Sequence, residues 1–104
     1  IGHSVQVFKS LSMKDSVKLF ENTDILLGPH GAGLSNMLYM QPGRGVVEFM
    51  VSGRDVNACY MYLAIKLGLR YHTWGDQRAS QNGKMTVDVE KILSIVSGMV
   101  SEMK

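Results

Sequence analysis

The stretch His30-Gly31-Ala32-Gly33-Leu34-Ser35-Asn36 lies between an apolar run and a helix-compatible run. Asp24-Ile25-Leu26-Leu27-Gly28 precedes it, and Met37-Leu38-Tyr39-Met40 follows. This order predicts a strand that enters a glycine-rich turn, from which a helix begins. Unpaired backbone N–H groups and the positive end of a helix dipole would meet at this turn, an environment that suits a phosphate group. A Cβ atom at Gly31 or Gly33 would hold a diphosphate away from the backbone.

Strand-like and helix-like runs alternate along the whole chain. Strands are predicted over residues 5–8, 24–27, 46–50 and 71–74, and helices over 12–20, 34–40, 55–68 and 88–102. Short connections between alternating strands and helices are typical of a parallel sheet with helices on both faces. We therefore predict one α/β domain over residues 1–104, with a three-layer α/β/α arrangement and four mostly parallel strands. Ligands of such sheets bind at the carboxyl ends of the strands.

Residue types at the ends and on the faces of the predicted helices support this order. Ser12 and Asp15 form the Ser-x-x-Asp pattern of a capping box, and Gly68 fits a carboxyl-terminal helix cap. Apolar residues at helical spacing are expected on buried faces. They are Met13, Val17 and Phe20 in the first helix; Val56, Cys59, Tyr60, Leu63 and Leu67 in the third; and Val89, Ile92, Leu93, Val96, Met99, Val100 and Met103 in the last.

The composition is that of an ordinary globular domain. Hydrophobic residues make up 45% and charged residues 19% of the 104 positions, which excludes a disordered chain. The net charge is only +2 and the lysines are scattered, so nucleic acid is not an expected partner. One cysteine, Cys59, cannot form an internal disulfide. Because the chain begins at Ile1, we expect it to be a piece of a longer protein.

The glycine turn is the first candidate site. Gly31, Ala32 and Gly33, with the N–H groups of Leu34 and Ser35, would surround a diphosphate. The alternative is a tight strand-to-helix turn in which the glycines serve only a positive φ or close packing.

Polar side chains on either side of these glycines could add contacts. His30 would donate a hydrogen bond to a diphosphate or to a sugar, or would merely cap the turn. Ser35 and Asn36 would supply side-chain donors, or would cap the helix. Gly28, at the end of the strand, completes the predicted donor-binding set.

Glu48 is the second candidate, since it places a carboxylate inside an apolar strand. An unpaired buried carboxylate is costly, so this group needs a partner or an open position at the strand end. A ribose diol would engage both carboxylate oxygens, as acidic residues do in other nucleotide-binding folds. An internal ion pair with Arg44 or Arg54 is the alternative.

Three further side chains have both a binding and a structural interpretation. Arg54 and Arg78 could neutralise phosphate charge, although each also fits a solvated surface position. Trp74 could stack on uracil or on a sugar, or could be buried. Cys59 is expected to be inert on an apolar helix face.

The segment 24–43, followed by Val46-Val47-Glu48-Phe49, resembles the signature of glycosyltransferase family 61. The resemblance extends through residues 59–64 and 68–74, while Pro29 and Ser35 depart from residues common at their positions. It implies a GT-B architecture of two Rossmann-like domains, in which this chain is the carboxyl-terminal, donor-binding domain. A Rossmann-like fold with a four-stranded sheet is then expected.

The resemblance also implies a reaction. The family transfers a sugar, such as GlcNAc or a pentose, from a UDP-sugar to a protein or polysaccharide hydroxyl, with inversion and generally without an essential metal or other cofactor. His30 would then stabilise the leaving diphosphate. The acceptor-side domain and the general base would lie in the missing amino-terminal part of the same protein, and the endoplasmic reticulum or Golgi lumen is the expected location in a eukaryote.

Two other functions remain as alternatives. One is a non-catalytic nucleotide-binding or degenerate Rossmann-like module. The other is a dinucleotide-binding oxidoreductase domain, whose fingerprint is Gly-x-Gly-x-x-Gly after the first strand. The chain instead has Gly28-Pro29-His30-Gly31-Ala32-Gly33, with the glycine spacing reversed, which argues against that domain.

Overall fold

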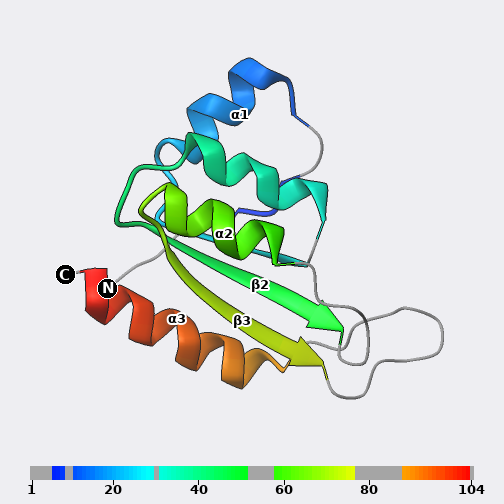
Figure 1. Ribbon diagram of the computed structural model, residues 1–104, viewed down its shortest axis with the longest axis vertical. Coiled ribbons are helices and arrows are strands. Elements are labelled where there is room, and N and C mark those ends of the chain that lie inside the picture. The colour runs from blue at the N-terminus through cyan, green and yellow to red at the C-terminus, as the bar shows by residue number, and fades with distance from the viewer. Residues whose placement is uncertain (1–5, 9–10, 30, 52–57, 77–87, 104) are drawn as a thin grey trace.

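The computed structural model describes residues 6–8, 11–29, 31–51, 58–76 and 88–103. Helices and strands alternate through these residues, as the sequence predicts (Figure 1). Along the chain they are α1 (Met13–Phe20), β1 (Ile25–Pro29), the 3₁₀ helix η1 (Ala32–Tyr39), β2 (Gly45–Val51), α2 (Cys59–Lys66), β3 (Arg70–Asp76) and α3 (Val89–Met103). Of the predicted helix over 55–68, residues 55–57 lie outside the described part of the chain.

The sheet has the order β1-β2-β3, and both pairs of neighbouring strands are parallel. Each crossover passes through a helix, η1 between β1 and β2 and α2 between β2 and β3. One row of register partners is Leu26, Val46 and Tyr71, and the row nearer the carboxyl ends is Gly28, Glu48 and Thr73. The carboxyl ends of all three strands, and the starts of η1 and α2, therefore belong to the same edge of the sheet.

The fourth strand predicted over residues 5–8 is not found. Residues 6–8 have no regular secondary structure, Val5 lies outside the described residues, and the sheet of the described chain has three strands. Phe8 instead packs edge-to-face on Phe20 of α1, with ring centroids 4.9 Å apart, while Val7 is exposed. Residues 6–8 thus contact a helix, whereas their short alternating pattern predicted pairing with a strand.

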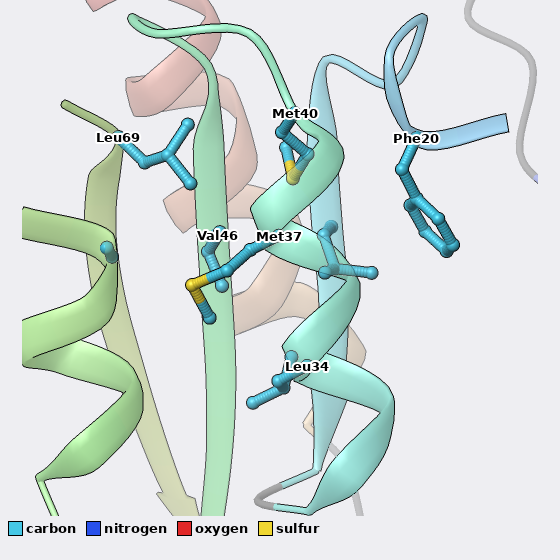
Figure 2. Packing of buried hydrophobic residues seen from close by; sticks show 8 residues of the cluster. Phe20, Leu34, Met37, Met40, Val46 and Leu69 are labelled. Atoms are coloured by element: carbon cyan, nitrogen blue, oxygen red, sulfur yellow. The ribbon is translucent and has the colours of Figure 1, made fainter. Parts of the chain in front are cut away.

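Helices cover both faces of the sheet (Figure 1). On one face, α1, η1 and α2 enclose a core with β1 and β2, in which Met37 of η1 lies over Val46 of β2 (Figure 2). On the other face α3 places Met99 against Gly45 of β2. The buried members of the first core are Phe20, Leu26, Leu34, Met37, Met40, Val46, Ala64 and Leu69.

Both predicted caps are confirmed. The Ser12 hydroxyl accepts a hydrogen bond of 3.2 Å from the backbone N–H of Asp15. Gly68 has a φ of 72°, and the N–H of Leu69 returns 2.9 Å to the carbonyl of Ala64. This is the Schellman arrangement, in which a left-handed glycine lets the helix end and the chain turn into β3.

The predicted apolar faces are only partly buried. Phe20, Ile92 and Met99 are buried, whereas Met13 and Val89 are largely exposed. Val17 and Leu93 are exposed as well. Part of each predicted apolar stripe therefore lies outside the core of the described residues. Among the described residues, none of the helices has both the length and the apolar content to cross a bilayer.

The close approach of α3 to β2 predicts the effect of one substitution. A Cβ atom on Gly45 would collide with the terminal methyl group of Met99, so this buried side chain must shift to make room. We expect Gly45→Ala to lower the free energy of unfolding by about 1–3 kcal/mol, as overpacking does, measured by urea denaturation. The double variant Gly45→Ala/Met99→Val should lose less than the sum of the two single variants. A fully additive result would contradict the contact.

Candidate functional site at the carboxyl edge of the sheet

The predicted phosphate-binding residues lie together where β1 leads into η1. Gly28 is in β1, Gly31 is the N-cap of η1, and residues 32–36 form the first part of that helix. His30 lies outside the described residues. The glycine turn is therefore at the sheet edge where the parallel fold places ligands.

The helix begins two residues earlier than predicted, and this changes which N–H groups are available. The N–H of Leu34 donates to the carbonyl of Gly31 at 3.0 Å, which closes the first 3₁₀ turn. In a 3₁₀ helix the N–H groups before that bond have no partner within the helix, and here they belong to Gly31, Ala32 and Gly33. The predicted donors Leu34 and Ser35 fall inside the helical hydrogen-bond pattern instead.

The backbone explains one of the two glycines of the turn and leaves the other unexplained. Gly31 has φ 156° and ψ 178°, a region that is almost restricted to glycine. Gly33 does not have a positive φ, and a Cβ atom on it would meet no atom of the described residues within 4 Å. Neither turn geometry nor packing within the described chain requires glycine at position 33, so open space over the backbone is the feature that Gly33 preserves.

Leu34 and Asn36 have structural roles. The Leu34 side chain is buried, and its Cδ2 lies 3.5 Å from the position of a Cβ atom on Gly28. Asn36 donates from Nδ2 to the carbonyl of Gly33 at 2.9 Å, which is the helix-capping alternative for this residue. Ser35 is exposed beside them. Leu34 thus fixes the start of η1 on the sheet, and Asn36 stabilises its first turn.

Glu48 is 0% exposed, and its Oε1 accepts a hydrogen bond from the hydroxyl of Tyr71 in β3. Arg44 and Arg54 are the two ion-pair partners that the sequence suggested for Glu48. Arg44 pairs with Asp24 instead, and Arg54 lies outside the described residues. The contact of Glu48 with a ribose stays a prediction. Sequence reasoning missed Tyr71, although a hydroxyl-bearing aromatic residue in a neighbouring strand was the available signal.

The environment of Tyr71 makes its hydroxyl a stable donor. Burial raises the pKa of Tyr71 above its ordinary value of 10.0, and the hydrogen bond and negative charge of Glu48 raise it further. Cys59 contributes in the same direction. The phenol therefore keeps its proton in the folded chain at pH values where an unfolded tyrosine ionises.

The pair predicts a stability loss on Tyr71→Phe. Removal of the hydroxyl leaves buried Glu48 without this donor, so the free energy of unfolding at pH 7 should fall by about 1–3 kcal/mol. Because the folded pKa is raised, the stability that Tyr71 contributes is complete below pH 10 and decreases above it. The difference between wild type and variant in urea unfolding should therefore shrink as the pH rises above 10. Tyr62→Phe, at an exposed tyrosine of α2, should change neither the free energy of unfolding at pH 7 nor its dependence on pH.

Other predicted residues lie apart from this turn or outside the described chain. Trp74 is partly buried and packs edge-to-face on Phe49, with centroids 6.2 Å apart, on the sheet face opposite Glu48. Cys59 is exposed at the start of α2, which corrects its expected burial. Arg78, like Arg54, lies outside the described residues. In the described part of the chain, no three His, Cys, Asp or Glu side chains gather as a metal site would require.

Comparisons with known proteins give the family. Residues 3–47 match the family described as Glycosyltransferase 61. The chain is 37% identical over 70 residues, 67% of its length, to the EGF domain-specific O-linked N-acetylglucosamine transferase of Bos taurus. It is 37% identical to the Drosophila melanogaster enzyme of that name and 34% identical to that of Mus musculus, each over 67 residues or 64% of the chain.

These matches cover only a small part of each relative. The aligned region is 13% of the Bos taurus protein and 12% of each of the other two. The family match includes β1, the glycine turn and the start of β2, and it ends one residue before Glu48. The chain belongs to glycosyltransferase family 61.

Proposed function

We propose that the chain is the donor-binding part of an inverting glycosyltransferase that uses a UDP-sugar. The observation that carries this proposal is the turn between β1 and η1 at the carboxyl edge of a parallel sheet, where a Cβ atom on Gly31 or Gly33 would meet no atom of the described residues. Membership of a glycosyltransferase family supports the same conclusion. The transferred sugar is GlcNAc or a pentose, and the acceptor is a hydroxyl of a protein or polysaccharide.

The diphosphate of the donor occupies the start of η1 in this proposal. In this proposal the N–H groups of Gly31, Ala32 and Gly33, at the positive end of the helix, hydrogen-bond phosphate oxygens. Because Gly33 has no Cβ atom, a phosphate can approach the backbone closely. Leu34 keeps this backbone in place through its side chain, which is buried in the core.

The remaining predicted residues have roles around this anion site. His30 stabilises the negative charge that develops on the leaving diphosphate, and Ser35 adds a hydroxyl at the exposed surface of η1. Glu48 is the predicted partner of the ribose, a contact that requires its buried carboxylate to become accessible.

The reaction needs groups beyond these. An acceptor hydroxyl attacks the anomeric carbon of the sugar as UDP leaves, and a general base removes the proton of that hydroxyl. We place the base and the acceptor site in the rest of the protein, since the chain corresponds to 13% of the length of its Bos taurus relative. In this proposal the N–H groups and His30 supply the charge stabilisation without a metal. The chain by itself is then expected to bind UDP without turnover.

Substitution of Gly33 tests the proposed diphosphate site. Gly33→Ala meets no atom of the described residues, so it should leave stability unchanged or raise it by about 0.4–1 kcal/mol. It should nevertheless weaken UDP binding at least about fivefold, equivalent to roughly 1 kcal/mol, because the new Cβ atom enters the space for the phosphate. Titration of the ¹⁵N-labelled chain with UDP, followed by amide chemical shifts, measures binding and folding in one sample.

Gly98→Ala is the matched control for this test. Gly98 lies inside α3 and also has no atom of the described residues near a Cβ position. The substitution should raise stability similarly and leave UDP affinity unchanged. Equal UDP affinity of wild type and Gly33→Ala, or no shift of the Ala32 and Gly33 amides on titration, would contradict the proposed site.

A further inference from the structure

Tyr71 of β3 reaches the buried side chain of Glu48 from the neighbouring strand. The register partner of Tyr71 is Val46 and that of Glu48 is Thr73, so the tyrosine begins two residues nearer the amino ends of the strands. Register partners, and residues two apart on a strand, share one face of the sheet. The Tyr71 side chain therefore runs diagonally toward the carboxyl edge, where its hydroxyl donates to Oε1 of Glu48.

The ring that carries this hydroxyl is held more firmly than the carboxyl group that accepts from it. Tyr71 packs against the core on this face of the sheet, and a tyrosine side chain has only two torsions. The last torsion of a glutamate has no sharp preference, so hydrogen bonds to the two oxygens set how the carboxyl group is rotated. The bond from Tyr71 thus fixes the place of Oε1 in Glu48.

This hydrogen bond orients Glu48 in the same way whichever protonation state the carboxyl group has. The phenol is the donor, and both an ionised carboxylate and the carbonyl oxygen of a neutral carboxyl group can accept from it. Each of these oxygens has two lone pairs, so an oxygen that accepts from Tyr71 can accept from a second donor. The contact with Tyr71 is therefore compatible with a hydrogen bond from a ligand hydroxyl to the same group.

The position of Glu48 relative to the glycine turn suits the ribose of a nucleotide. Gly28 and Thr73 are its register partners on the two neighbouring strands, and Gly31 follows Gly28 by three residues. Gly28 is partly exposed and Thr73 is exposed, although Glu48 between them is 0% exposed. The ribose of a nucleoside diphosphate is joined directly to the first phosphate. A diphosphate at the turn therefore brings its ribose near the strand that carries Glu48.

We propose that Tyr71 is a positioning residue, whose hydroxyl holds the carboxyl group of Glu48 in the orientation that accepts from the ribose hydroxyls of the donor. This inference rests on the proposed function and adds a residue to its ribose contact. The physical basis is preorganisation, because a side chain that is oriented before the ligand arrives loses less conformational freedom on binding. Tyr71 acts here through Glu48 and does not touch the ligand.

The preference of the chain for a ligand with ribose hydroxyls tests this role. We compare the affinities for UDP and for 2′,3′-dideoxy-UDP, which lacks both hydroxyls, by calorimetry. Wild type should bind UDP about tenfold more tightly, and in Tyr71→Phe this ratio should fall about three- to tenfold, the effect of weakening one or two hydrogen bonds. Inorganic pyrophosphate has no ribose, so its affinity should be the same for wild type and Tyr71→Phe.

The ratio separates a positioning role from a merely structural one. A partly unfolded sample lowers the apparent affinities for UDP and dideoxy-UDP by the same factor, so the stability loss expected for Tyr71→Phe leaves their ratio unchanged. Tyr62→Phe, at the exposed tyrosine of α2, is the matched control and should keep the wild-type ratio.

A measurement on wild type keeps the test decisive if Tyr71→Phe does not fold. With ¹³C-labelled tyrosine rings, saturation with UDP should shift the Tyr71 signals, because the ribose contacts the carboxyl group to which this hydroxyl is bonded. Saturation with dideoxy-UDP should shift them much less. Equal shifts with the two ligands would overturn the positioning role.

The remaining outcomes distinguish this inference from the proposals beneath it. A wild-type ratio in folded Tyr71→Phe would overturn the role of Tyr71 and leave the ribose contact of Glu48 in place. Equal affinity of wild type for UDP and dideoxy-UDP would overturn the ribose contact and this inference together, while the diphosphate site would stand. If wild type binds neither UDP nor pyrophosphate, the proposed function itself fails.

Discussion

The candidate site depends on the packing of one side chain, Leu34, into the core. Its buried side chain anchors the first turn of η1 in the core, and only two residues separate the end of β1 from the start of η1. The N–H groups that precede the first helical hydrogen bond are therefore kept at the sheet edge. A polar residue at position 34 would remove the hydrophobic free energy of burying this side chain, which is what orients the turn.

The same core sets the environment of Glu48. Val46, two residues earlier on the same face of β2, packs under Met37 (Figure 2), and the Glu48 carboxylate on that face is likewise fully buried. Desolvation of a carboxylate is unfavourable unless hydrogen bonds compensate for it. The Tyr71 hydroxyl supplies one such bond from the neighbouring strand, so the polar contact is a consequence of how β2 and β3 align.

Much of the fold could be predicted because its signals are local. The parallel β1, β2 and β3, the Ser12 cap and the Gly68 cap follow from short patterns whose physics operates within a few residues. Residues 6–8 did not follow their pattern: Phe8 packs on Phe20 of α1, a contact between residues twelve positions apart that a local alternating pattern does not reveal. Exposed Val89 shows the same limit: a helical pattern does not reveal which of its apolar residues will be covered by the rest of the fold.

The sequence by itself determined the glycine turn after an apolar strand, the family to which the chain belongs and the presence of a carboxylate in β2. Each is a property of residues that are neighbours along the chain. Only the tertiary structure decided that Leu34 gives its N–H to Gly31, which moves the available donors to residues 31–33. It also decided that Tyr71 is a partner of Glu48. Both outcomes depend on the register of the strands and on where η1 begins. Close packing sets both, because it brings together residues that are distant in the sequence.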